Sequence, residues 1–131
     1  MTDALGGQRL EKSISYMTHH RESFPALEDA QTHRQMQEIE ERITARPLYF
    51  LPREKLFSIE DQLQDGDLLA ITTSMDGLDV AHVGIALRQQ GRVHLLHASR
   101  LAGVVLISPE TLYGYLRKKK ERTGVMVARA V

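Results

Sequence analysis

The sequence predicts an α+β fold in which helices come first and an antiparallel sheet follows. One long segment, residues 30–45, has helical spacing, and several short apolar segments separated by glycine-containing turns follow from residue 63 onward. Consecutive strands joined by such turns favour antiparallel pairing. One amphipathic segment interrupts the strands near the end of the chain. With 131 residues, the chain is expected to form one domain.

Residues 1–62 are expected to form a helical and loop segment beside the sheet. Between residues 30 and 45, Met36, Ile39 and Ile43 recur at helical spacing and make one narrow apolar stripe. Pro47 ends this pattern, and residues 48–52 follow as a short apolar segment that ends in a second proline. This segment fits a brief edge strand or a loop that packs inward.

Residues 63–131 are expected to form a sheet of about five strands. The turn at Asp65-Gly66 suits a positive φ and precedes the first of these strands. The strands are expected near residues 68–73, 80–87, 92–98, 103–107 and 125–131. One late helix is expected after the fourth strand, with Ser108 as its N-cap and Pro109 at its first position.

Composition excludes several classes of function. Seventeen basic and seventeen acidic residues balance, so nucleic-acid binding has no electrostatic support. No apolar run approaches the ~20 residues of a transmembrane segment, and residues 1–7 do not resemble a signal peptide. The chain has no cysteine, which excludes disulfides, thiolate metal sites and a cysteine nucleophile within these residues.

His82 and His97 lie inside two successive apolar strand segments and are the main candidates for chemistry. A histidine on a half-buried strand must satisfy two ring nitrogens, and most such residues are structural. Antiparallel neighbours across a tight turn, however, lie within about 5 Å of one another. Two histidines within reach, one orienting the other, suit a general base and its partner. The residues alone leave both interpretations open.

A metal site is the rival interpretation of these histidines. His94 and His97 have the spacing H-x-x-H, but residues three apart on a strand point to opposite faces. They should therefore not share an ion, and we expect no metal and no cofactor. The same parity separates Asp79 from His82 unless Asp79 lies in the preceding turn.

Three segments resemble the strands of NlpC-type cell-wall peptidases. Residues 65–70, 81–86 and 95–99 match the G-D-L, H-V-G-I and I-H-A-S strands of that group in the same order. The chain resembles most closely the subfamily called N-acetylmuramoyl-L-alanine amidase-like. That resemblance extends to the flanking residues 14–20, 49–52 and 123–129.

The resemblance implies a papain-like (NlpC-type) sheet and a Cys-His-His site that hydrolyses amide bonds of peptidoglycan. It makes His82 the general base and His97 the residue that orients it. Asp79, Ser99 and Tyr49 become candidate substrate-binding residues. The expected partner is a peptidoglycan fragment or muropeptide. If the full-length protein is exported, the resemblance implies the periplasm or cell envelope.

The absent cysteine departs from the family pattern. In the resembling enzymes the nucleophile lies at a helix N-terminus upstream of the matched strands. The resemblance therefore implies a C-terminal part, incomplete at the N-terminus and inactive by itself, with the missing N-terminal half as a partner. The alternative is a non-catalytic muropeptide-binding or structural domain that keeps the groove without turnover. Whether the chain is an enzyme stays open at this point.

Overall fold

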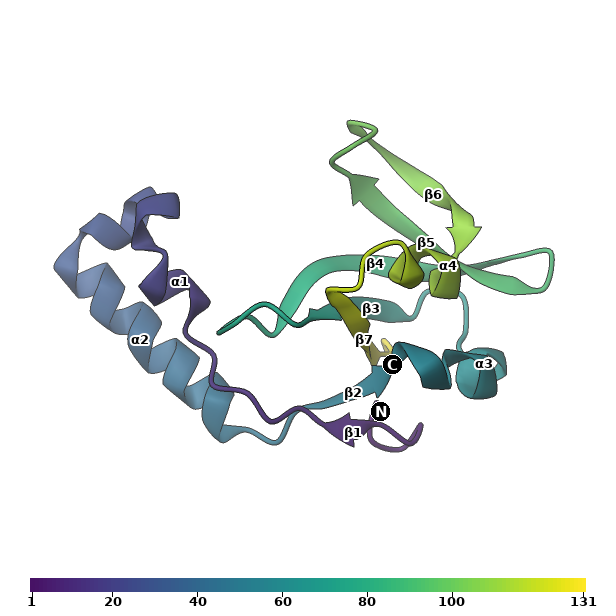
Figure 1. Cartoon of the computed structure of the whole chain (residues 1–131), viewed down its shortest axis with the longest axis horizontal. Coiled ribbons are helices and arrows are strands. Elements are labelled where there is room, and N and C mark those ends of the chain that lie inside the picture. The colour runs from purple at the N-terminus through teal and green to yellow at the C-terminus, as the bar shows by residue number, and fades with distance from the viewer.

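The sheet of this protein has seven strands and is antiparallel throughout (Figure 1). We describe residues 1–131 from a computed structural model. The strand order is β1-β2-β7-β3-β4-β5-β6. The strands are β1 (Gln8–Arg9), β2 (Tyr49–Pro52), β3 (Leu68–Thr73), β4 (Val80–Gln89), β5 (Arg92–Ser99), β6 (Val104–Thr111) and β7 (Arg122–Ala128). The α-helices are α1 (Tyr16–His19), α2 (Ala30–Ala45), α3 (Leu56–Ile59) and α4 (Leu112–Arg117).

The α+β class is confirmed, but the expected count of about five strands is wrong. The two additional strands, β1 and β2, come from residues 1–62. β1 is only Gln8–Arg9, which is too short and too polar to show alternation. β2 pairs with β1 through Tyr49 and Phe50, and with β7 through Leu51 and Pro52.

The helix at residues 30–45 forms as predicted, and Asp29 caps it by accepting the N–H of Thr32. The predicted cap at Ser108 is wrong, because β6 continues to Thr111 and Thr111 caps α4 by accepting the N–H of Gly114. Ser108 lies in an irregularity of the β5–β6 pairing. Its buried hydroxyl accepts the N–H of Leu95 and donates to the carbonyl of Glu110.

The hydrophobic core lies on one face of the sheet, beneath α3 and α4. It combines residues of β3, β5 and β7 with those of the two helices: Leu69, Ile71, Val93, Leu95, Val125, Val127, Leu56, Ile59, Leu112 and Leu116. Burial of such side chains stabilises the fold by roughly 1.5–3 kcal/mol each. The core thus fixes the position of α4 over the strands that carry the two candidate histidines.

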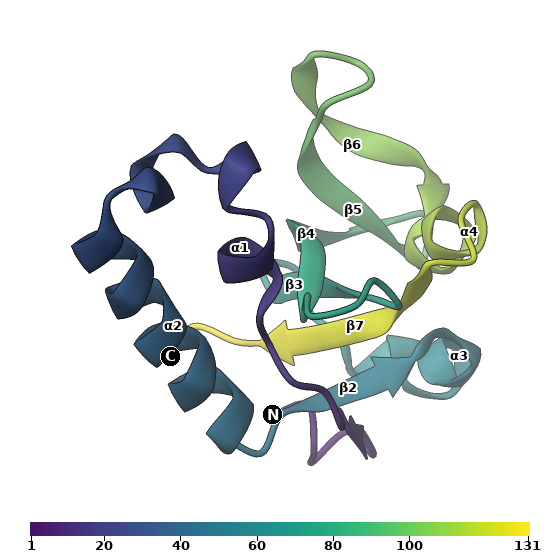
Figure 2. The same ribbon diagram turned by 60° about the vertical axis from the view of Figure 1, so that its left-hand side comes forward.

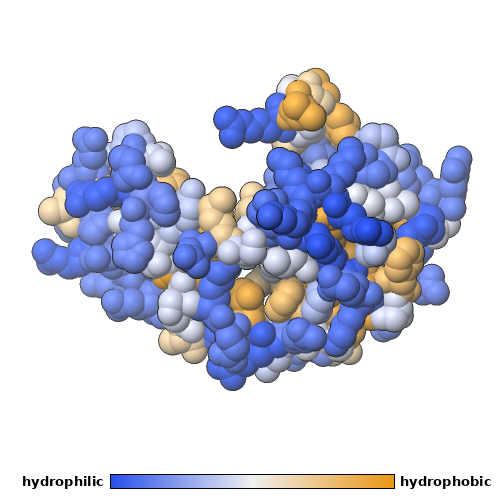
Figure 3. Space-filling model, viewed as in Figure 1, coloured by the Kyte–Doolittle hydropathy of each residue, from blue (hydrophilic) through white to orange (hydrophobic).

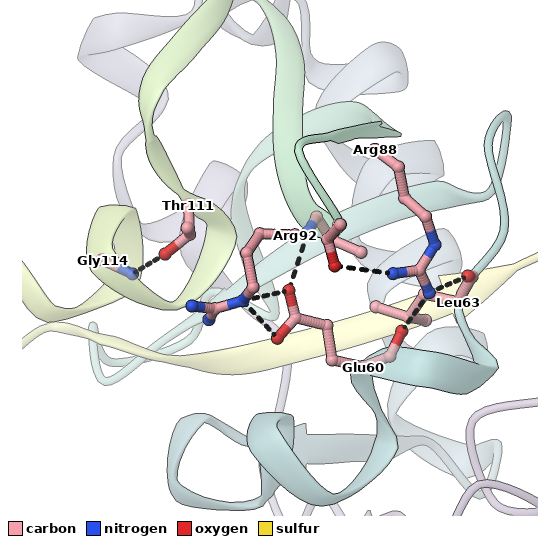
Figure 4. Close-up of polar contacts among 8 residues, drawn as sticks. Glu60, Leu63, Arg88, Arg92, Thr111 and Gly114 are labelled. Atoms are coloured by element: carbon pink, nitrogen blue, oxygen red, sulfur yellow. Dashed lines mark hydrogen bonds and ion pairs between the residues drawn. The ribbon is translucent and has the colours of Figure 1, made fainter.

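Polar contacts fasten the turn after α3 to the β4–β5 hairpin (Figure 4). The carboxylate of Glu60 accepts hydrogen bonds from Nε of Arg92 and from the N–H of Val93. Arg88 donates to the carbonyls of Glu60 and Leu63. These bonds hold the hairpin at the end of the sheet remote from β1.

α1 and α2 form a helical arm beside the sheet (Figure 2). Lys12 fastens the chain just before the arm, because its ammonium donates to the carbonyls of Thr73 and Leu78 at 2.7 Å each. The backbone N–H groups of Ser15 and Tyr16 both donate to the carbonyl of Gly77. The arm therefore holds the loop that precedes β4. None of the helices has the length and apolar character needed to cross a membrane.

Candidate active site

The rings of His82 on β4 and His97 on β5 contact each other on the face of the sheet that carries the core. Nε2 of His82 lies 2.8 Å from Nδ1 of His97, and the ring centroids are 5.0 Å apart with planes at 86°. His97 shares its face of β5 with Leu95, and His82 shares its face of β4 with Ala86. The predicted proximity of the two histidines is confirmed.

An irregularity in β4 sets the direction of His82. Ile71 of β3 pairs with His82, whereas Thr72 pairs with Val80, so Ala81 is an extra residue in β4. Such a bulge increases the local twist and redirects the following side chain. Gly84, the next residue on the face of His82, has no side chain to separate β4 from Leu95. Both features let the two rings come together.

The bond between the rings limits which proton arrangement can support catalysis. If His82 donates its Nε2–H to Nδ1 of His97, then Nδ1 of His82 keeps a free lone pair. That tautomer is the one a general base needs. His82 is half-buried, while His97 is only 8% exposed. The geometry therefore makes His82 the ring that a reactant can reach and His97 the ring behind it.

Burial and nearby charges favour the neutral form of both rings. Burial, the neighbouring His97 and the cation of Arg122 all lower the pKa of His82. Burial also lowers the pKa of His97, where Glu110 opposes the shift and Arg122 adds to it. A neutral imidazole near pH 7 is able to accept a proton.

Tyr115 and Arg122 complete the surroundings of the pair, and neither was among the site residues predicted from the sequence. The ring of Tyr115 lies 5.3 Å from that of His97 in a T-shaped contact and 6.4 Å from that of His82. Arg122 stacks over Tyr115 with Cζ 3.9 Å from the ring centroid. The spacing of Tyr115 from Leu112 was the available signal, since residues three apart share a helix face.

The remaining candidates occupy different places. Asp79 directly precedes β4, and its Oδ1 accepts the N–H of Val80. Ser99 ends β5 and its hydroxyl accepts the N–H of Ala102. Ser99 therefore lies on a strand of the pair and Asp79 directly before the other, whereas Tyr49 lies on β2, separated from β4 by β7 and β3. Substrate binding by these three residues stays a prediction.

His94 lies on the opposite face from His97, as its parity predicts, and its Nδ1 donates to the carbonyl of Ser108 at 2.8 Å. No group of three or more histidine, cysteine, aspartate or glutamate side chains lies together in a way that could hold a metal ion.

A cavity of about 480 Å³ adjoins the loop before β4. Its lining is polar and includes Lys12, Tyr16, His20 and Asp76. The surface is also hollowed between the helical arm and the β5–β6 hairpin (Figure 3). The residues that line the cavity do not include His82 or His97.

A family model and a solved structure carry the same amidase name. The family described as N-acetylmuramoyl-L-alanine amidase-like matches residues 2–125. An N-acetylmuramoyl-L-alanine amidase from Bacteroides uniformis is 34% identical, with a TM-score of 0.86 over 92% of this chain and 52% of its own. A Bacteroides fragilis protein that bears the name of a xylanase is 34% identical, with a TM-score of 0.89 over 96% and 56%.

The chain therefore spans about half the length of these solved structures, 52% and 56% of their chains. No protein with a curated description matches it significantly. The sheet, its late helix and the paired histidines lie almost wholly within the matched residues 2–125.

Proposed function

Because the chain belongs to the N-acetylmuramoyl-L-alanine amidase-like family, we propose that it carries the histidine part of a Cys-His-His amidase site for peptidoglycan. The bond of 2.8 Å between His82 and His97 is the observation that carries this proposal. A papain-like, NlpC-type arrangement is part of it. In such an arrangement, His82 is the general base and His97 orients its ring.

The pair suits acyl transfer from an amide. Nδ1 of His82 takes the proton of a thiol, and the thiolate attacks the carbonyl carbon of the substrate. The C–N bond then breaks, and the imidazolium of His82 protonates the leaving amine. Water, deprotonated by the same imidazole, hydrolyses the thioester and restores the thiol. His97 accepts the Nε2–H of His82 throughout and holds the ring of His82 in one orientation.

The thiol must come from outside these 131 residues, because they contain no cysteine. We propose that further residues of the same enzyme supply it, in keeping with the greater length of the related structures. Sequencing the DNA directly upstream of Met1 tests this source. An in-frame cysteine codon ahead of a helix-forming segment supports the catalytic role, and a translation start at Met1 itself removes it.

Binding of a muropeptide tests the site in the chain itself. Titration with muramyl dipeptide, followed by NMR of ¹⁵N-labelled histidine side chains, should shift the resonances of His82 and His97. His94 is the matched control, since it lies on the same strand and faces the other way. Equal shifts at His94, or unchanged resonances of the pair, would contradict the proposed site. If muramyl dipeptide binds but no cysteine is encoded upstream, the result favours a non-catalytic muropeptide-binding domain.

A further inference from the structure

We propose that Tyr115 and Arg122 are positioning residues of the imidazole pair: Tyr115 holds the rings, and Arg122, stacked on Tyr115, keeps an unpaired cation close to them. The importance of these two residues for catalysis rests on the proposed function, but the positioning role can be tested without an active enzyme. Three observations support it, namely the stack of rings, the fixation of the guanidinium and the absence of a counter-charge.

The stack runs from β7 through α4 to the two strands. The guanidinium of Arg122 lies over the ring of Tyr115, with Cζ 3.9 Å from the centroid. The same ring meets His97 edge to face at 71° and 5.3 Å. His97 in turn binds His82. Aromatic edge contacts and cation–π contacts both favour one relative orientation of the groups, so Tyr115 restrains the ring that orients His82.

Arg122 is fixed at its side chain and at its backbone. Its Nη1 donates to the carbonyl of Tyr115 at 2.7 Å. Its N–H donates to the carbonyl of Lys119, and its own carbonyl accepts from Nη1 of Arg53. These bonds tie the start of β7 to the end of α4, and they keep the cation beside Tyr115.

The charges around the pair leave the effect of Arg122 unopposed at His82. The groups that act on His82 are His97 and Arg122, both of which disfavour its protonated form. At His97, Glu110 favours that form, but Glu110 is itself paired with Lys118 at 3.2 Å. The strand neighbours of the two histidines, Ile71 and Leu106, are apolar.

Arg122 has no carboxylate within ion-pairing distance, in contrast to Arg92 and Arg129, which pair with Glu60 and Asp67. A half-buried cation that lacks an anionic partner raises the electrostatic potential at neighbouring groups more than an ion-paired cation does. A neutral imidazole is the form that can accept a proton.

NMR titration of the histidine side chains tests the role of Arg122. In Arg122→Gln the two macroscopic midpoints of the pair should rise by roughly half a unit, whereas Arg122→Lys should keep them near the wild-type values. Arg117→Gln is the matched control, because Arg117 stacks on Tyr113 in the same helix and does not act on the pair. Its midpoints should equal those of the wild type.

High salt gives a second test that needs no variant. About 1 M NaCl screens exposed charges over ~3 Å, so it should raise the midpoints in the wild type and change them much less in Arg122→Gln. Unchanged midpoints in Arg122→Gln, together with no salt effect in the wild type, would overturn the electrostatic role.

The role of Tyr115 is tested by its ring. Tyr115→Phe should keep a single ¹⁵N tautomer pattern at His82, and Tyr115→Leu should replace it by an averaged pattern in a chain that still melts cooperatively. An unaltered pattern in Tyr115→Leu would overturn the positioning role. Failure of muramyl dipeptide to bind, with these shifts present, would reject the proposed function and leave this inference standing.

Discussion

At the scale of single residues, the contact between His82 and His97 is the central feature of the candidate site. Each ring gives one nitrogen to the 2.8 Å bond and keeps the other for a reactant or for solvent. A buried ring nitrogen without a partner would be costly, by about 1–3 kcal/mol. The bond therefore gives one nitrogen of each ring a hydrogen-bond partner and leaves Nδ1 of His82, the more exposed ring, free.

We expect the stability of the protein to fall as the pH falls below about 6.5, the unperturbed pKa of histidine. Burial lowers the pKa of both His82 and His97, so the unfolded chain binds more protons than the folded one in this range. Their contribution is complete above that pH and is lost as the pH falls through the lowered values. Each proton contributes at most about 1.4 kcal/mol per pH unit.

Melting temperatures between about pH 7.5 and pH 5 measure this dependence. The double variant His82→Gln, His97→Gln should show a flatter profile than the wild type. The hydrogen bond from Arg129 lowers the pKa of Asp67. The protonation of Asp67 therefore changes stability only below the ordinary aspartate pKa of 3.8, outside the pH range of this measurement. Equal slopes in the variant and the wild type would contradict the assignment.

Gly84→Ala should destabilise the protein by about 1–3 kcal/mol, the cost of overpacking a core. An added Cβ would lie 2.9 Å from the carbonyl of Leu96 and would overlap the side chain of Leu95, which is fully buried and has no space to move. The strands would separate, and the bond between His82 and His97 would lengthen. Chemical unfolding measures the loss. Val83→Ala, on the exposed face, should cost much less.

At the scale of elements, the end of β6 and the start of α4 place Tyr115. The sequence favoured a helix from Ser108. In the structure, the hydroxyl of Ser108 accepts the N–H of Leu95 in place of a backbone carbonyl, and residues 108–111 stay in the strand. The helix consequently begins at Leu112, capped by Thr111. This start orients Leu112 and Leu116 into the core and Tyr115 toward His97.

Thr111→Ala should destabilise the protein by about 1 kcal/mol, because the N–H of Gly114 loses its acceptor. α4 has only six residues, so the loss of its cap should also loosen Tyr115 and alter the histidine resonances of the pair. Thermal unfolding and NMR measure the two effects. Thr111→Ser keeps the hydroxyl and should behave as the wild type. A histidine spectrum unchanged in Thr111→Ala would contradict the coupling.

At the scale of the whole molecule, the sheet has one covered face and one uncovered face. Leu68, Ile85, Leu96 and Ile107 pair in sequence across four strands and form an apolar stripe on the face opposite the core. Beside it, Val83 is 62% and Val105 69% exposed. Hydrophobic atoms also gather at the tip of the β5–β6 hairpin (Figure 3). Contiguous exposed apolar surface promotes association.

We therefore expect the isolated chain to associate in a concentration-dependent way. Size-exclusion chromatography with light scattering measures it. The double variant Val83→Lys, Val105→Lys introduces charge at outward positions and should shift the distribution toward the monomer. Glu38→Lys, on the exposed side of α2, adds charge elsewhere and should leave association unchanged. A wild-type chain that remains monomeric at all concentrations would contradict this expectation.

Local pattern was sufficient for several features of this protein. Helix α2 follows from the spacing of Met36, Ile39 and Ile43, and the turn before β3 follows from Gly66, whose φ is +91°. The short turn between the two strands places His82 and His97 on one hairpin, whereas the contact of their rings also depends on Gly84 and on the irregularity at Ala81. The family could be recognised from the same strands.

Tertiary structure decided the rest, because it depends on contacts between residues far apart in the chain. β1 exists only because β2 offers it free backbone groups, and Ser108 stays in a strand only because Leu95 needs an acceptor. Arg122 and Tyr115 reach the histidines through the packing of α4 over β5 and β7. The residue types were all present in the sequence, but which cation lies beside which ring is a property of the folded core, where burial strengthens their interaction.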